Sequence, residues 1–110
     1  MKITIKELPL KKKTYEVKQS VKNMRKTYKM QLVFAENTDM DGKDDKEVMA
    51  GVIESFDVAL NYIKDILKLS DKDVEKIEDE LDQNQLFEVA NKVAMDLMGV
   101  KPEDLDDPKK

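Results

Sequence analysis

The chain of 110 residues has the length of one ordinary domain, and 40% of its residues are apolar and 40% charged. It contains no cysteine and no histidine, which excludes disulfides, thiolate chemistry and the commonest general base and transition-metal ligand. No apolar run approaches the roughly 20 residues of a membrane span, and no signal peptide opens the chain. We therefore expect a soluble, cytosolic protein with a small core and a large charged surface.

Charge is divided unevenly along the chain. Residues 1–34 hold nine lysines and one arginine against two glutamates, a net charge of +8. Residues 35–110 hold ten lysines against twenty-two acidic residues, a net charge of −12. A basic first third can indicate nucleic-acid binding, but it fits equally well two segments that fold against each other and neutralise. We favour the second interpretation.

The first 18 residues predict a β-hairpin. Ile3, Ile5, Tyr15 and Val17 alternate with polar residues, which is the period of a half-buried strand. The two alternating runs are separated by a basic connection that contains Pro9. A lone hairpin is marginal in water, so we expect this one to pack on other elements.

Helical spacing begins after Ser20, which is a suitable N-cap. The spacing predicts a helix over residues 21–35, and its core face consists of Val21, Met24, Tyr28, Leu32 and Ala35. A neighbouring face is basic and contains Lys22, Arg25, Lys26 and Lys29. The run QLVF, residues 31–34, also fits a strand, so the end of this helix is left open.

The segment NTDMDGKDDKEV, residues 37–48, raises the question of calcium binding. Asn37, Asp39 and Asp41 stand at positions 1, 3 and 5 of an EF-hand loop, and Gly42 stands at position 6. Position 12 should be a carboxylate that binds the ion through both oxygens, but here it is Val48. We therefore do not expect a calcium site.

A structural role explains the same segment. Residues 37–42 are rich in turn-forming residues and predict a connection. Asp44 then caps the next helix, and Glu47 at the third helical position would complete a capping box.

The longest predicted element is a helix from Lys46 to Leu69, which contains no proline and one glycine. Its polar residues gather in a narrow stripe that consists of Glu54, Asp57, Asn61, Lys64, Asp65 and Lys68. The apolar side consists of Met49, Val52, Ile53, Phe56, Ala59, Leu60, Ile63, Ile66 and Leu67, widened by Val48, Val58, Tyr62 and Leu69. A helix that is apolar over more than half of its circumference is usually central in a fold.

Two further capping signals predict two more helices. Ser70 with Asp73 begins a short helix whose inward face consists of Val74, Ile77 and Leu81. Asp82 with Gln85 begins the last helix, which Gly99 ends. Its apolar face consists of Leu86, Phe87, Ala90, Val93, Ala94, Leu97 and Met98.

These elements predict one α+β domain over residues 1–100. The N-terminal β-hairpin, residues 1–18, packs on a bundle of about four helices within residues 21–98, with one long central helix. Residues 101–110 are polar and acidic, and we expect a flexible tail.

The chain offers little that could carry out catalysis. Its carboxylates are spread over helix faces and caps, and with three glycines it has no phosphate-binding loop. We expect no enzyme, no cofactor and no metal site. What remains is apolar surface, and methionine suits adaptable contacts with a partner. The predicted partner-binding residues are Met49, Val58, Tyr62, Met95 and Met98.

Several stretches of the chain together resemble a known family. They are MKITIKEL, KTYEVKQSVKNMRKTYKMQL, an acidic loop, and GVIESFDVALNYIKDILKLSDKDVEKIED. In order and character they are similar to the tail assembly chaperones of long-tailed phages of Gram-positive bacteria, often carried as prophages. The resemblance covers nearly the whole chain, and it rests on no catalytic motif.

This resemblance implies a function. It implies a chaperone of the host cytoplasm, absent from the finished virion, that binds and solubilises the tape measure protein and helps recruit tail tube subunits. It is also compatible with homo-oligomers and with a longer frameshifted form. The alternative is a small nucleic-acid-binding regulator that uses Lys11, Lys12, Lys13, Lys22, Arg25, Lys26 and Lys29.

Overall fold

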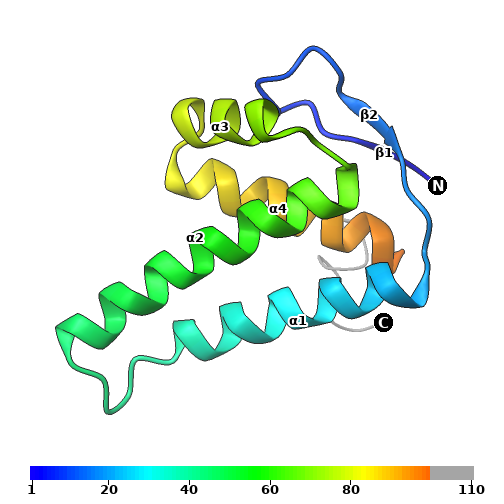
Figure 1. Ribbon diagram of the computed structural model, residues 1–110. Coiled ribbons are helices and arrows are strands. Elements are labelled where there is room, and N and C mark those ends of the chain that lie inside the picture. Colours follow the sequence, from blue (N-terminus) through cyan, green and yellow to red (C-terminus); the bar gives the residue numbers. More distant parts are fainter. Residues whose placement is uncertain (100–110) are drawn as a thin grey trace, which may run out of the picture.

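The computed structural model describes residues 1–99, so the tail expected over residues 101–110 lies outside the described residues. The predicted α+β fold is confirmed: a two-stranded hairpin is followed by four helices (Figure 1). The elements are β1 (Lys2–Thr4), β2 (Thr14–Glu16), α1 (Val21–Thr38), α2 (Asp45–Leu67), α3 (Asp71–Glu80) and α4 (Gln83–Met98). The long predicted helix corresponds to α2, which has 23 residues.

The hairpin is short and antiparallel, and it packs through one face. Ile3 of β1 is paired with Tyr15 of β2, and both are buried. Two more hydrogen bonds extend the pairing beyond the strands: Ile5 N–H donates to the Lys13 carbonyl and Val17 N–H to the Met1 carbonyl, both at 2.8 Å. The buried hairpin residues belong to the same core as residues of α2 and α4, which gives this small sheet the packing that it needs.

The predicted core face of α1 is wrong except at Met24, which packs against the core. Val21, Tyr28 and Leu32 are exposed, and the residues that α1 buries are Thr27 and Met30. Helical spacing places Met30 on nearly the opposite side of α1 from both Tyr28 and Leu32. The helix also extends to Thr38, which rules out the strand alternative for residues 31–34.

A buried hydrogen bond orients α1 on α2. The Thr27 hydroxyl donates to the Asn23 carbonyl at 2.9 Å, and the Tyr62 hydroxyl lies 2.7 Å from Thr27 Oγ1. Because the Thr27 hydrogen is committed to Asn23, Tyr62 is the donor of the second bond. Burial raises the pKa of Tyr62 to about 12 from its usual 10.0.

Because the pKa of Tyr62 is raised by folding, we expect the free energy of unfolding to fall in strong alkali. The unfolded state loses the Tyr62 proton near pH 10, whereas the folded state holds it to about pH 12. This contribution is therefore fully present below pH 10 and is lost as the pH rises to about 12. Tyr62→Phe should cost about 1 kcal/mol at pH 7, because one hydrogen bond is lost. Above pH 10 the free energy of unfolding of this variant, measured by urea denaturation, should fall less steeply with pH than that of the wild-type chain. Equal pH profiles would contradict the raised pKa of Tyr62.

The predicted start of α2 is confirmed in part. Asp44 is the N-cap, and its Oδ1 accepts from Glu47 N–H at 2.8 Å. The reciprocal bond to the Glu47 carboxylate, which the sequence predicts, is absent from the hydrogen bonds of residues 1–99. The C-terminal half of α2 is central as expected, with Ala59, Ile63 and Ile66 fully enclosed.

Both of the later capping boxes are confirmed. Ser70 with Asp73 begins α3, and Asp82 with Gln85 begins α4. The predicted end of α4 is confirmed as well, because Gly99 adopts the left-handed conformation at a φ of 74°. None of the helices within residues 1–99 combines the length and the apolar character that crossing a membrane requires.

Candidate functional site

Part of the helical hairpin formed by α1 and α2 projects beyond the rest of the fold. Figure 1 shows the C-terminal half of α1 and the N-terminal half of α2 extending past α3 and α4 to the loop that joins them. We call residues 31–56 the arm. The lengths explain it: α2 has 23 residues and α4 has 16, so α2 is longer by about 10 Å at 1.5 Å per residue.

A polar contact holds the two helices of the arm together. The Asn37 side-chain amide donates to Glu54 Oε1 at 2.9 Å and to Ser55 Oγ at 3.1 Å. Asn37 was expected in the connecting loop, but it lies in the last turn of α1. The helices approach closely here: a Cβ placed on Gly51 would lie 2.9 Å from Asn37 Oδ1.

This close approach should reverse the usual effect of replacing a helical glycine. Gly→Ala within a helix normally stabilises by about 1 kcal/mol. At Gly51 the new methyl group meets an amide that two hydrogen bonds hold in place. We therefore expect Gly51→Ala to lower the free energy of unfolding by about 1 kcal/mol, measured by urea denaturation.

The matched control removes the obstruction. In the Asn37→Ala background, Gly51→Ala should stabilise, because only the helix propensity remains. Equal effects of Gly51→Ala in the two backgrounds would show that Asn37 does not restrict this position.

Three phenylalanines join the base of the arm to α4. The Phe87 ring lies 5.4 Å from that of Phe34 in an edge-to-face arrangement and 5.6 Å from that of Phe56 in a stacked one. Each helix of the arm thus contributes one ring to a contact with α4, so Phe87 fixes the position of both helices.

Beyond this base, the apolar stripe of α2 continues without cover. Met49 is 60% exposed and Ile53 is 59% exposed. Both lie on the same side of α2 as Phe56 and Leu60, which pack on the fold. Met40 in the loop is also exposed. We call Met40, Met49 and Ile53 the arm ridge.

Two clefts flank the arm near its base. The first has a volume of about 340 Å³, and its apolar wall consists of Phe34, Met40, Val52 and Phe87. The second has a volume of about 320 Å³ and an apolar wall of Ile53, Phe56, Leu60, Ile77, Leu81 and Leu86. Gln83, at the start of α4, borders both clefts, and one member of the arm ridge borders each.

The second cleft has an acidic border. Asp57, Glu78 and Asp82 line it beside the apolar wall, and no cationic side chain of residues 1–99 does so. Such a border favours a ligand that combines an apolar face with lysine or arginine at its edges.

The five predicted partner-binding residues are not brought together. Met49 lies on the arm ridge, whereas Tyr62 is 4% exposed in the core. Val58 and Met98 are half-buried and packed against the core, and Met95 is half-buried on α4. Sequence reasoning missed Met40 and Ile53. The difference in length between α2 and α4 could have indicated Ile53, because α4 cannot cover the whole apolar stripe.

The loop at the tip of the arm is a turn. Asp39 Oδ1 accepts from Asp41 N–H at 3.1 Å, and Lys43 Nζ donates to the Glu36 carbonyl at 2.8 Å. Gly42 has a φ of 75°. Within residues 1–99 no three acidic side chains are grouped as a metal ion would require.

The seven basic residues of the nucleic-acid alternative fall into two groups. Lys11 and Lys12 share a cleft with residues of α2 and α3, and Lys13 Nζ donates to the Leu8 carbonyl. The Lys12 ammonium lies 5.0 Å from the centre of the Tyr15 ring, and burial together with the charge of Asp73 raises the pKa of that phenol.

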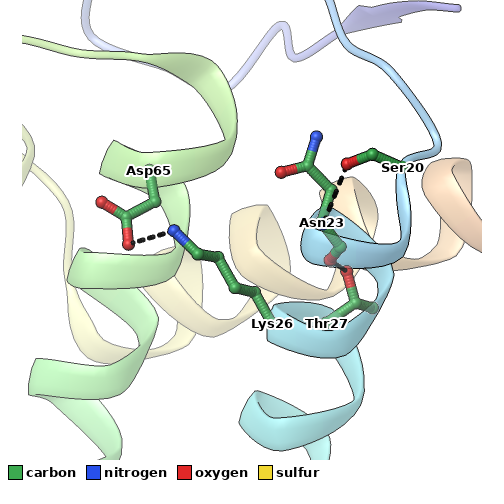
Figure 2. A network of polar contacts seen from close by, with 5 residues as sticks. All are labelled: Ser20, Asn23, Lys26, Thr27 and Asp65. Carbon is green, nitrogen blue, oxygen red and sulfur yellow. Dashed lines mark hydrogen bonds and ion pairs between the residues drawn. The ribbon is translucent and has the colours of Figure 1, made fainter.

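The other four basic residues lie on α1. Lys26 pairs with Asp65 of α2 at 3.0 Å, as Figure 2 shows. Lys22, Arg25 and Lys29 lie on the outer side of the helix beside the exposed apolar residues. The structure therefore does not gather the basic residues into one stripe.

Comparison with known protein families identifies a relationship that covers the whole chain. The family model described as phage tail assembly chaperone proteins, TAC, matches residues 1–110, the whole chain. Searches of the curated proteins and of the solved structures returned no match.

Proposed function

Because the chain belongs to the family of phage tail assembly chaperones, we propose that it binds and solubilises the tape measure protein through the arm. A chaperone role in phage tail assembly follows from the family itself. The observation that supports the finer proposal is the arm ridge. Met49 and Ile53 continue the apolar stripe of α2 without cover, and Met40 is exposed in the loop. Met40 and Ile53 each border an apolar cleft.

The geometry fits the binding of a helix in a groove. An amphipathic helix of the client would lay its apolar face on Met49 and Ile53 and place individual side chains in the clefts. Methionines at positions 40 and 49 can change rotamer to fit successive client segments of different sequence. The acidic border of the second cleft would select segments with flanking lysine or arginine.

We further propose the wider setting that the family resemblance implies. The chaperone acts in the host cytoplasm, is absent from the finished virion and helps recruit tail tube subunits. Homo-oligomers would allow several arms to cover one long client. Of the predicted residues, Met49 is the centre of the proposed contact. Met95 and Met98, which are half-buried on α4, are the alternative contact. Val58 and Tyr62 pack within the fold.

Co-expression tests the proposal. The tape measure protein should be largely insoluble when expressed alone and soluble with the chaperone, and the two should copurify. Ala50→Asp, on the polar side of α2, should preserve this effect. A tape measure protein that stays insoluble alongside a folded, abundant chaperone would refute the proposal.

A further inference from the structure

The exposed face of α1 forms a shallow groove that is separate from the arm ridge. Its apolar floor consists of Val21, Met24, Tyr28 and Leu32, and the groove has a volume of about 450 Å³. Tyr28 is 53% exposed and Leu32 62% exposed. We call this the α1 groove.

The α1 groove carries uncompensated positive charge. Arg25 and Lys29 line it. Lys26, on the adjoining side of α1, is paired with Asp65 (Figure 2), but no carboxylate within residues 1–99 is in ion-pair distance of Arg25 or Lys29. An apolar floor beside two such cations fits a peptide that carries both an apolar side chain and carboxylates.

The C-terminal end of α4 lies beside this groove. The Gln19 side-chain amide donates to the carbonyl of Leu97, in the last turn of α4. Gln19 itself lines the α1 groove. Gly99, the last described residue, therefore follows a helical turn that is bonded to the border of the groove.

Those residues have the matching composition. Residues 100–110 read VKPEDLDDPKK, in which Leu105 stands between two pairs of carboxylates. The acids are Glu103, Asp104, Asp106 and Asp107. Tyr28 lies nine residues after Gln19, about 13 Å along the helix axis. The six residues from 100 to 105 extend to at most about 20 Å. The length is thus sufficient for Leu105 to reach Tyr28.

We propose that residues 100–110 occupy the α1 groove of their own molecule, with Leu105 against Tyr28 and the flanking carboxylates on Arg25 and Lys29. A short tether holds the two partners at an effective concentration in the millimolar range. A contact with a dissociation constant of about 1 mM is therefore enough to fill the groove about half of the time. The segment shields an apolar face that α1 would otherwise present to other proteins.

A spin label tests this in the full-length chain. Because the protein has no cysteine, Pro108→Cys gives a single attachment site for a nitroxide. We expect the label to broaden the amide NMR signals of residues 21–32 and to spare those at the tip of the arm. Broadening that is absent from residues 21–32 would overturn the proposal.

Charge reversal supplies the specific control. Arg25→Glu with Lys29→Glu should remove the broadening, and adding Asp104→Lys with Asp106→Lys should restore it. Lys46→Glu with Lys72→Glu, on exposed positions of α2 and α3, should leave it unchanged. Salt at 1 M, where the Debye length is about 3 Å, should weaken it. Broadening that persists in the Arg25→Glu, Lys29→Glu variant would contradict the charge pairing.

Mixing distinguishes the possible occupants. Spin-labelled chain without ¹⁵N is mixed with ¹⁵N-enriched chain that carries no spin label. We expect no broadening, since the contact is within one molecule. Broadening of residues 21–32 in the mixture would show that the occupant is a second copy and would refute the proposal. These results are independent of client binding, because the assay contains no client.

Discussion

Ile53→Asp with Met49→Asp is expected to abolish client binding while the fold stays intact. Both side chains are more than half exposed, so the substitutions place charge in water and not in the core. In the complex the same carboxylates would be buried under an apolar client face without partners. Loss of a central apolar contact costs 2 kcal/mol or more, so we expect affinity to fall by at least about 30-fold.

The measurement is titration of the chaperone with a soluble tape measure segment, followed by calorimetry or fluorescence anisotropy. The matched control is Ala50→Asp, which introduces the same charge within the same part of α2 but on its polar side. It should change the affinity less than about threefold, as expected for a peripheral charge. Equal losses in the two variants would mean that charge alone, and not the arm ridge, determines binding.

The second large effect is expected at Phe87. Phe87→Ala removes the ring that contacts both Phe34 and Phe56, and it should lower the free energy of unfolding by about 3 kcal/mol. Because both helices of the arm meet α4 through this ring, the loss should be concentrated in the arm. Hydrogen exchange should accelerate in residues 31–56 before it does so around Ile63.

Phe87→Leu provides the comparison. It keeps much of the apolar area but not the aromatic geometry, so it should cost less, about 1 to 1.5 kcal/mol. If Phe87→Ala leaves hydrogen exchange in the arm unchanged but accelerates it in the β-hairpin and in the C-terminal half of α2, the three rings do not hold the arm. The two variants together separate loss of volume from loss of ring contact.

Local signals in the sequence were sufficient for the starts of α3 and α4 and for the end of α4. Ser70 with Asp73 and Asp82 with Gln85 each form the capping box that their spacing predicts, and Gly99 ends α4. These signals depend only on residues within one turn of each other. The order of elements and the fold class followed from them and from the alternation in the hairpin.

The orientation of α1 could not be predicted in this way. Its sequence offers two faces at helical spacing, and the more apolar one, with Tyr28 and Leu32, is exposed. The choice is made by Thr27, which bonds to Tyr62, 35 positions away in the sequence. Such a contact is invisible to periodicity, which describes one helix at a time.

The candidate site was predicted only in its general nature. Sequence analysis placed excess apolar surface on α2 and identified Met49, but it included Tyr62, whose hydroxyl serves a buried bond. It listed Ile53 on the apolar side of α2 but did not single it out, because periodicity does not show where along a helix the cover ends. What covers a helix depends on the lengths of its neighbours, and this information is spread over the entire chain.

The central claim is that the arm carries apolar surface that the fold does not use and a client does. The seven methionines report on it, because the protein can be labelled at the methionine methyl groups alone. When a tape measure segment is added, we predict shifts of the methyl signals of Met40 and Met49, while buried Met30 stays unchanged. Shifts confined to Met95 and Met98, with the arm signals unmoved, would contradict the account.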